Sequence, residues 1–325
     1  MRPPDPPRRT VIEPQDDHSH PVGGEPAWSE SYYFNFVDTS SGIAGLTRIG
    51  FRPNEGTADG TLYVFLPGGA GVAVLNRDRR TDVPDEVAVG GLRYERGFDL
   101  RRWIVECVGT GLAVQRAGDL DITEAKGGGA GGKIVPVRAA LTFVATMPPF
   151  GTSGRTRRTE DAQAAAASVA AGHFEQACRV NGFVTVARQR YEIKGIGLRD
   201  KSWGPRDWSA PWGWRWFSIP FDRDFAIGVH AVMLPGREVQ AGWVWRDNRL
   251  IKMAGFELDT EYDGRDQQKM RIAATDVEGN RYDVEGNVRS VIPIRIGSTR
   301  VAEGLTEFRM DGRTTVGIAE YLDNR

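Results

Sequence analysis

Glycine is frequent in this sequence, and it separates short runs that are rich in β-branched and aromatic residues. There are 40 glycines among the 325 residues, about 12% against a usual value of about 7%. Short runs of this kind, bounded by turn residues, are typical of many antiparallel strands. The spacing therefore restricts the chain to an all-β fold, in which the strands close into barrels or stack as sandwiches.

The predicted strands fall into two groups, and one helix is predicted between them. Thr159 and two acidic residues begin this helix, an alanine-rich stretch over 162–171 continues it, and Gly172 ends it. We therefore expect a β domain at residues 28–150, a linker with the helix at 151–172, and a second β domain at 173–325. Each domain is of ordinary size.

The first 27 residues differ in composition from the rest of the chain. They contain seven of the 18 prolines and no apolar core of a signal peptide. We expect them to form a flexible arm. No stretch is long and apolar enough to be a membrane helix, so a cytoplasmic location is the default expectation.

Charge and metal-ligand counts exclude several classes of function. The 42 basic and 43 acidic residues nearly balance, which argues against nucleic acid or an anionic membrane as a partner. Two cysteines are too few for a disulfide framework or a thiolate zinc site. Of the four histidines, His18 and His20 lie in the arm. We therefore expect no metal site and no cofactor.

Tryptophan is concentrated between residues 203 and 216, where five of the nine tryptophans occur. In a strand, Trp212, Trp214 and Trp216 would share one face. Together with Trp203 and Trp208 they could line a cavity for a lipophilic molecule, and indole faces also attract positive charge. They could equally form an ordinary β core. The nearby Arg206 and Asp200 favour the cavity.

Strand alternation identifies titratable groups that face the same side as apolar residues. Glu320 shares a face with Val316, Ile318 and Leu322 in the last predicted strand, Glu30 shares one with Tyr32, and His230 lies among small and aliphatic residues. A carboxyl group buried among apolar side chains has a raised pKa and can donate a proton near neutral pH. The other interpretation is a buried polar group whose hydrogen bonds are satisfied. A register error of one residue would reverse each assignment.

The segment from residue 173 to 216 resembles a known family. It contains His173-Phe-Glu-Gln176, then Gly195-x-Gly197-Leu-Arg-Asp-x-Ser-Trp-Gly-Pro-Arg-Asp-Trp208, then Trp212-x-Trp214-Arg-Trp216. This pattern is similar to bacterial two-domain lipocalin-like proteins that group with AttH-like proteins and acyclic carotenoid hydratases (hydroxyneurosporene synthase). The resemblance implies two consecutive calycin-type β domains with a ligand cavity near their junction, and relatives that include hydratases, dehydratases and cyclases. The family motif has histidine where this chain has Lys201.

These observations predict a cofactor-independent acid/base enzyme. It would hydrate, dehydrate, isomerise or cyclise an unsaturated lipophilic substrate of terpenoid, steroid or polyketide type. The candidate catalytic residues are Asp200, Lys201, Glu320 and Glu175, and the candidate substrate-binding residues are Trp203, Arg206, Trp208, Trp212, Trp214, Trp216, Tyr32 and His230. Two alternatives remain open: a lipocalin-like protein that binds a hydrophobic molecule without changing it, and an assembly protein whose tryptophans anchor an interface. The sequence also leaves open whether the chain is a homodimer.

Overall fold

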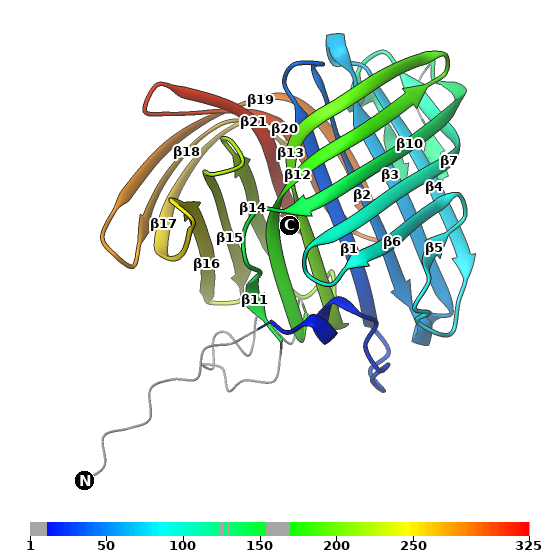
Figure 1. Cartoon of the computed structure of the whole chain (residues 1–325), viewed down its shortest axis with the longest axis horizontal. Helices are drawn as coiled ribbons and strands as arrows, with labels where there is room; N and C mark the ends of the chain where they lie inside the picture. The colour runs from blue at the N-terminus through cyan, green and yellow to red at the C-terminus, as the bar shows by residue number, and fades with distance from the viewer. Residues whose placement is uncertain (1–11, 124–125, 129–130, 154–169, 325) are drawn as a thin grey trace.

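The computed structural model describes residues 12–123, 126–128, 131–153 and 170–324. Within these residues the protein is almost entirely β, with two antiparallel barrels side by side (Figure 1). The expected all-β, lipocalin-like fold is therefore confirmed. The predicted linker helix over 162–171 lies largely outside the described residues.

The first sheet closes on itself because β10 pairs with both β12 and β7. We call the ring β10-β12-β13-β1-β2-β3-β4-β7 the first barrel. The strands of this sheet are β1 (Trp28–Asp38), β2 (Ile43–Arg52), β3 (Thr57–Phe65), β4 (Gly71–Arg79), β5 (Val87–Val89), β6 (Leu92–Phe98), β7 (Arg102–Val114), β10 (Lys133–Ala145), β11 (Phe150–Thr152), β12 (Gly172–Val186) and β13 (Gln189–Pro205).

The second sheet closes in the same way, through the pairing of β18 with β19. We call the ring formed by β14 to β21 the second barrel. The strands of this sheet are β8 (Asp121–Thr123), β9 (Lys126–Gly128), β14 (Gly213–Pro220), β15 (Ala226–Leu234), β16 (Arg237–Arg246), β17 (Arg249–Asp263), β18 (Asp266–Asp276), β19 (Arg281–Ile296), β20 (Thr299–Met310) and β21 (Arg313–Asp323). Short 3-10 turns, all in the first half of the chain, are η1 (Pro14–Asp17), η2 (Pro53–Glu55), η3 (Pro67–Gly69) and η4 (Ala117–Asp119).

The first barrel includes two strands that follow residue 173, where we expected the second domain to begin. Residue 173 lies at the start of β12, yet β12 and β13 pair with β10 and β1 and complete the first barrel. The chain passes from the first barrel to the second between β13 and β14. The short strands β8 and β9 come earlier in the chain but also belong to the second sheet. A strand's own sequence does not specify its pairing partner, so the sequence alone could not place β12 and β13.

Each barrel has its own apolar interior, and a further apolar layer joins the two barrels. Phe36 and Trp103 belong to the core of the first barrel, and Phe217 and Tyr321 belong to that of the second. Alternate residues of the same strands point outward and pack between the barrels, as Val37 and Ile318 do. We call this layer, where the outer faces of the two barrels meet, the seam.

Residues 12–27, which we expected to be flexible, are packed against one end of the first barrel (Figure 1). Asp17 is fully buried and forms an ion pair with Arg199 at 2.7 Å. It also accepts hydrogen bonds from the backbone N–H of Leu100 and from the indole of Trp103. A buried carboxylate with these partners holds the segment in place, since losing them would leave its charge uncompensated. In the described part of the chain, no helix has the length and apolarity needed to span a membrane.

Candidate functional site

The predicted site residues of β12 and β13 point in two opposite directions. On β12, His173 and Glu175 face the seam, while Phe174 between them is fully buried against Trp203. On β13, Asp200 faces the seam and lies opposite Glu175 in the pairing register, while Lys201 points into the first barrel. Successive side chains of a strand alternate between its two faces, so Asp200 and Lys201 cannot belong to the same site.

The second barrel contributes aromatic and imidazole groups from the opposite side of the seam. Trp216 on β14 lies opposite His230 on β15 in the register, and Trp243 on β16 pairs with Gly228 on β15. Their neighbours Phe217 and Val229 turn into the core of the second barrel. Alternation thus directs three ring systems of the second barrel toward β12 and β13.

Four titratable groups meet at this point, and we call His173, Glu175, Asp200 and His230 the central cluster. Both oxygens of Glu175 accept an indole hydrogen bond, from Trp216 and from Trp243, each at 2.7 Å. His173 Nε2 bonds Asp200 and lies 3.7 Å from Glu175 Oε1, and His230 Nδ1 lies 3.8 Å from the same oxygen. The cluster therefore consists of two side chains on β12, one on β13 and one on β15.

Electrostatics assigns a charge state to each member of the pair His173 and Asp200. Burial lowers the pKa of His173, but the Asp200 carboxylate outweighs burial and raises that pKa to about 9. Burial would raise the pKa of Asp200, yet the charge of His173 holds it below its usual value. Burial lowers the pKa of His230. Near neutral pH the cluster contains an imidazolium–carboxylate pair beside a neutral imidazole.

The central cluster also has the donor set of a metal site, contrary to what the histidine count suggested. One ligand atom from each of His173, Glu175 and Asp200 lies within 4.8 Å of the others. Imidazole and carboxylate together suit a divalent cation such as Zn²⁺. These residues could hold one if the proton between His173 and Asp200 were displaced, because metal-bound histidine must be neutral.

A second group lies farther along the seam, around Glu320 on β21. The indole of Trp214 donates a hydrogen bond to Glu320. Arg206 lies over the ring of Trp208 at 4.4 Å and near that of Trp214 at 5.7 Å. The two indoles contact each other, with ring centroids 5.3 Å apart. Glu320 thus faces the seam among aromatic rings, as the alternation of its strand indicated.

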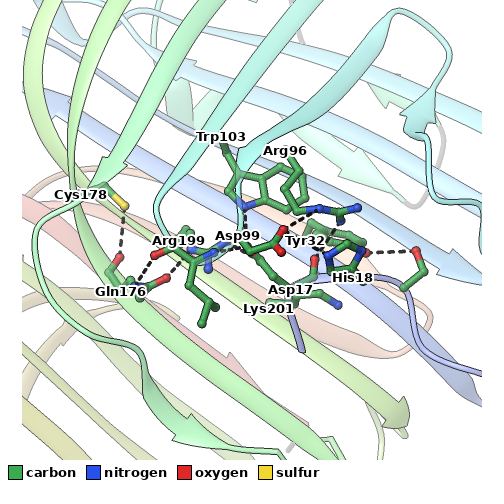
Figure 2. Close-up of polar contacts among 12 residues, drawn as sticks. Asp17, His18, Tyr32, Arg96, Asp99, Trp103, Gln176, Cys178, Arg199 and Lys201 are labelled. Atoms are coloured by element: carbon green, nitrogen blue, oxygen red, sulfur yellow. Dashed lines mark hydrogen bonds and ion pairs between the residues drawn. The ribbon is translucent and has the colours of Figure 1, made fainter. Parts of the chain in front are cut away.

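Lys201 and Tyr32 lie elsewhere, inside the first barrel and beneath the N-terminal segment (Figure 2). Lys201 is almost fully buried and forms an ion pair with Glu30. Its ammonium lies 4.4 Å from the ring of Tyr32 and 5.1 Å from that of Trp203. Burial lowers the pKa of Lys201, and Glu30 opposes this effect. We call Lys201, Glu30, Tyr32 and Trp203 the inner group. His20 of the N-terminal segment stacks on Trp203, with the ring centroids 3.8 Å apart.

The five clustered tryptophans therefore do not line one cavity. Trp203 belongs to the inner group, Trp208 packs with Trp214 and Trp216 in the seam, and Trp212 is 43% exposed. A cavity of about 250 Å³ does lie between the barrels, but it is at another part of the seam. It is lined by Val37, Asp38, Thr39, Gly42, Ile43, Ala44, Arg289, Leu305, Thr314, Thr315 and Val316.

Three seam residues were not among the predicted site residues. His173 stands two positions before Glu175, so alternation alone places both on one face. Trp243 stands two positions before Trp245 on β16, so alternation places these two indoles on one face as well. Glu303 lies directly opposite Glu320, and no pattern in a single sequence reveals such a cross-strand neighbour. The first two could have been found from their spacing, and the third could not.

Comparison with known proteins agrees with this architecture. A family model described as Domain of unknown function (DUF7064) matches residues 13–325, and no curated protein matches the chain. Among solved structures, an AttH protein from Nitrosomonas europaea is similar over 98% of both chains, with 12% identity and a TM-score of 0.62. Kievitone hydratase from Nectria haematococca is similar over 96% of this chain and 92% of its own, with 12% identity and a TM-score of 0.61.

A protein named CghA is similar over 97% of this chain and 95% of its own, with 12% identity and a TM-score of 0.56. At these identities the likeness concerns the fold, and it confirms the resemblance to AttH-like proteins that the motif around Asp200 indicated. The chain belongs to the family described as Domain of unknown function (DUF7064) and has the AttH-like, lipocalin-like all-β fold.

Proposed function

We propose that this protein is a cofactor-independent enzyme that transfers protons to and from an unsaturated lipophilic substrate bound in the seam. One observation carries the proposal: the central cluster brings an imidazolium–carboxylate pair, a second carboxylate and a neutral imidazole together beneath indole rings. Titratable groups of opposite protonation state, buried close together, are the arrangement that acid/base catalysis requires. The terpenoid, steroid or polyketide character of the substrate is part of the proposal.

For a hydration, the chemistry balances with water as the only co-reactant. A protonated carboxyl at Glu320 gives its proton to one carbon of a C=C bond, and the π electrons form the new C–H bond. A water oxygen attacks the cationic carbon, and the neutral ring of His230 takes the proton that this water loses. Indole faces and the carboxylates of Glu175 and Asp200 stabilise the cation. Dehydration is the reverse, and isomerisation removes a proton from a neighbouring carbon instead.

The similar structures support this class of reaction, since one of them is named as a hydratase. The fold alone does not specify a reaction, because one fold can hold many chemistries. The main support for the proposal therefore comes from the arrangement of the titratable side chains in the seam.

The test is an incubation of the purified protein with unsaturated terpenoids, steroids and aromatic polyketides in D₂O. An active enzyme incorporates deuterium into substrate or product at carbon. We expect Glu320→Gln to lower the rate by about 10²-fold or more, the usual contribution of a positioned acid or base. Asp200→Asn should lower the rate as well, because it removes a charge that stabilises the cation. Glu307→Gln is the matched control, because Glu307 lies on the same sheet but pairs with Arg289 and Arg309. Unchanged rates in both seam variants would refute the proposal.

A binding protein is the second candidate, and one observation favours it. Both oxygens of Glu175 already accept hydrogen bonds from the protein, which suits a structural carboxylate as well as a catalytic one. Under this alternative, a ligand quenches tryptophan fluorescence while its chemical structure and deuterium content stay unchanged.

A further inference from the structure

The register of the last two strands places two carboxyl groups opposite each other in the seam. Glu303 on β20 pairs directly with Glu320 on β21. Their neighbours Ala302, Ala319 and Tyr321 turn into the core of the second barrel. Both carboxyls therefore project from the same face of the sheet, toward the first barrel. Glutamates in such a pair have Cβ atoms about 5 Å apart.

The surroundings give this pair little compensation for two negative charges. Glu303 is 3% exposed, and among the described residues its Oε2 has no hydrogen-bond partner. Glu320 accepts hydrogen bonds from the indole of Trp214 and from the carboxyl of Glu303. Within the described ranges, no ion pair involves either carboxyl. By contrast, Glu307 on the same strand pairs with two arginines.

The charged and titratable groups around the pair come from several elements. Tyr33 on β1 and Tyr63 on β3 face Glu303 with neutral hydroxyls, since burial raises the pKa of both phenols. Asp200 on β13 adds a further negative charge near Glu320, whereas Arg206 supplies a positive one. Of the two glutamates, Glu320 is the one that interacts with this arginine, which also interacts with Asp200. One carboxylate can therefore be compensated, and the other cannot.

Two like charges directly opposite each other are unfavourable even on an exposed sheet. In a buried site the usual outcome is that the two carboxyls share one proton. Burial and the neighbouring Glu320 raise the pKa of Glu303 well above its ordinary value. Burial raises the pKa of Glu320 as well, although the hydrogen bonds from Glu303 and Trp214 and the charge of Arg206 oppose it.

We propose that Glu303 and Glu320 form a proton-sharing pair that holds one proton at neutral pH, and that this pair, rather than Glu320 alone, is the proton donor of the seam. The proton-sharing pair itself does not depend on the proposed function. Only the transfer of its proton to a substrate carbon rests on that function. In the transfer, the O–H bond of the pair breaks and a C–H bond of the substrate forms. The pair is left with two negative charges, and it recovers its proton when the proton that His230 has taken from the adding water is returned to it.

The first test needs no substrate. Infrared spectroscopy of the whole protein distinguishes the C=O stretch of a protonated carboxyl from carboxylate bands. Above pH 7, where an ordinary glutamate with a pKa of about 4.3 is ionised, we expect the wild type to retain a protonated-carboxyl band. Glu303→Gln should remove this band, because Glu320 then keeps its charge beside Arg206. Glu307→Gln should leave the band unchanged. A wild type without the band, or a Glu303→Gln variant that retains it, would overturn the inference.

The second test separates the pair from the proposed function. With a substrate in hand, Glu303→Gln should lower the rate at pH 7 by about 10²-fold. The variant lacks Glu303, the carboxyl whose pKa is raised well above its ordinary value. It should therefore also move the loss of activity at high pH toward lower pH. If the protonated-carboxyl band is present but no substrate is converted, the proton-sharing pair is supported and the proposed enzymatic function is contradicted. If a substrate is converted but the band is absent, the enzymatic function is supported and the pair is contradicted.

Discussion

At the scale of single residues, the His173–Asp200 pair makes the stability of this fold depend on pH. In the unfolded chain the pKa of histidine is about 6.5, and in the folded protein the Asp200 carboxylate, opposing burial, raises that of His173 to about 9. A raised histidine pKa stabilises the fold fully below the unfolded value. This contribution is then lost as the pH rises through about 9.

We therefore expect the free energy of unfolding of the wild type to fall by roughly 3 kcal/mol more than that of His173→Gln between pH 6 and pH 9.5, since one pKa unit corresponds to about 1.4 kcal/mol. Urea denaturation at both pH values measures this difference. Groups remote from His173 titrate alike in both proteins and cancel, whereas the pKa values of Asp200 and His230 depend on the charge of His173 and belong to the same effect. His18→Gln, which removes an exposed pair with Asp99, should follow the wild type. A pH-independent gap between wild type and His173→Gln would contradict the assignment.

At the scale of the strand, glycines opposite tryptophans make room for the indoles. Gly228 lies opposite Trp243, and a Cβ at this glycine would lie 2.4 Å from the indole ring. Gly172 stands in the same relation to Trp203, where the distance would be 2.1 Å. A ring can lie flat across the neighbouring strand only where that strand has no side chain at this position.

We expect Gly228→Ala to destabilise the protein by about 1–3 kcal/mol, the usual cost of overpacking a core. It should also displace Trp243 and break the indole hydrogen bond to Glu175. Denaturation measures the first effect, and a shift in tryptophan emission reports the second. Gly24→Ala is a suitable control, since a Cβ there meets no atom within 4 Å. If Gly228→Ala kept both its free energy of unfolding and its emission spectrum, the indole of Trp243 would not depend on the missing side chain at this position.

The strand scale also shows what a sequence can predict here. Alternation correctly indicated that Glu320 lies on the face of Val316 and Ile318, and the last predicted strand corresponds to β21. The periodicity of a strand identifies which residues share a face, but it does not identify what packs against that face. The sequence therefore could not show that the apolar face of β21 lies in the seam and not in a barrel interior. Likewise, the docking of residues 12–27 depends on Asp17 reaching Arg199, a contact between positions far apart in the sequence. The opposition of Glu303 and Glu320 depends on a register that only the folded sheet sets.

At the scale of the whole molecule, the seam makes the two barrels one cooperative structure. Its largest apolar cluster combines residues of the first barrel, such as Leu46 and Phe65, with Ile292 and Ile318 of the second. Separating the barrels would expose this layer to water, at about 25 cal/mol for each Å² of apolar surface. The central cluster would be divided as well, since Glu175 accepts its two indole hydrogen bonds across the seam.

We therefore expect a single unfolding transition, with coincident curves from tryptophan fluorescence and from far-ultraviolet circular dichroism. Ile318 is fully buried in the seam, so Ile318→Ala should lower the free energy of unfolding by about 2–5 kcal/mol and shift both curves together. Val277→Ala, at a residue that is 60% exposed in a turn of the second barrel, should change neither curve measurably. If Ile318→Ala instead produced two separate transitions, the barrels would be only weakly coupled. The groups of the seam would then meet only while the barrels stay docked, and catalysis there would fail at denaturant concentrations at which each barrel remains folded.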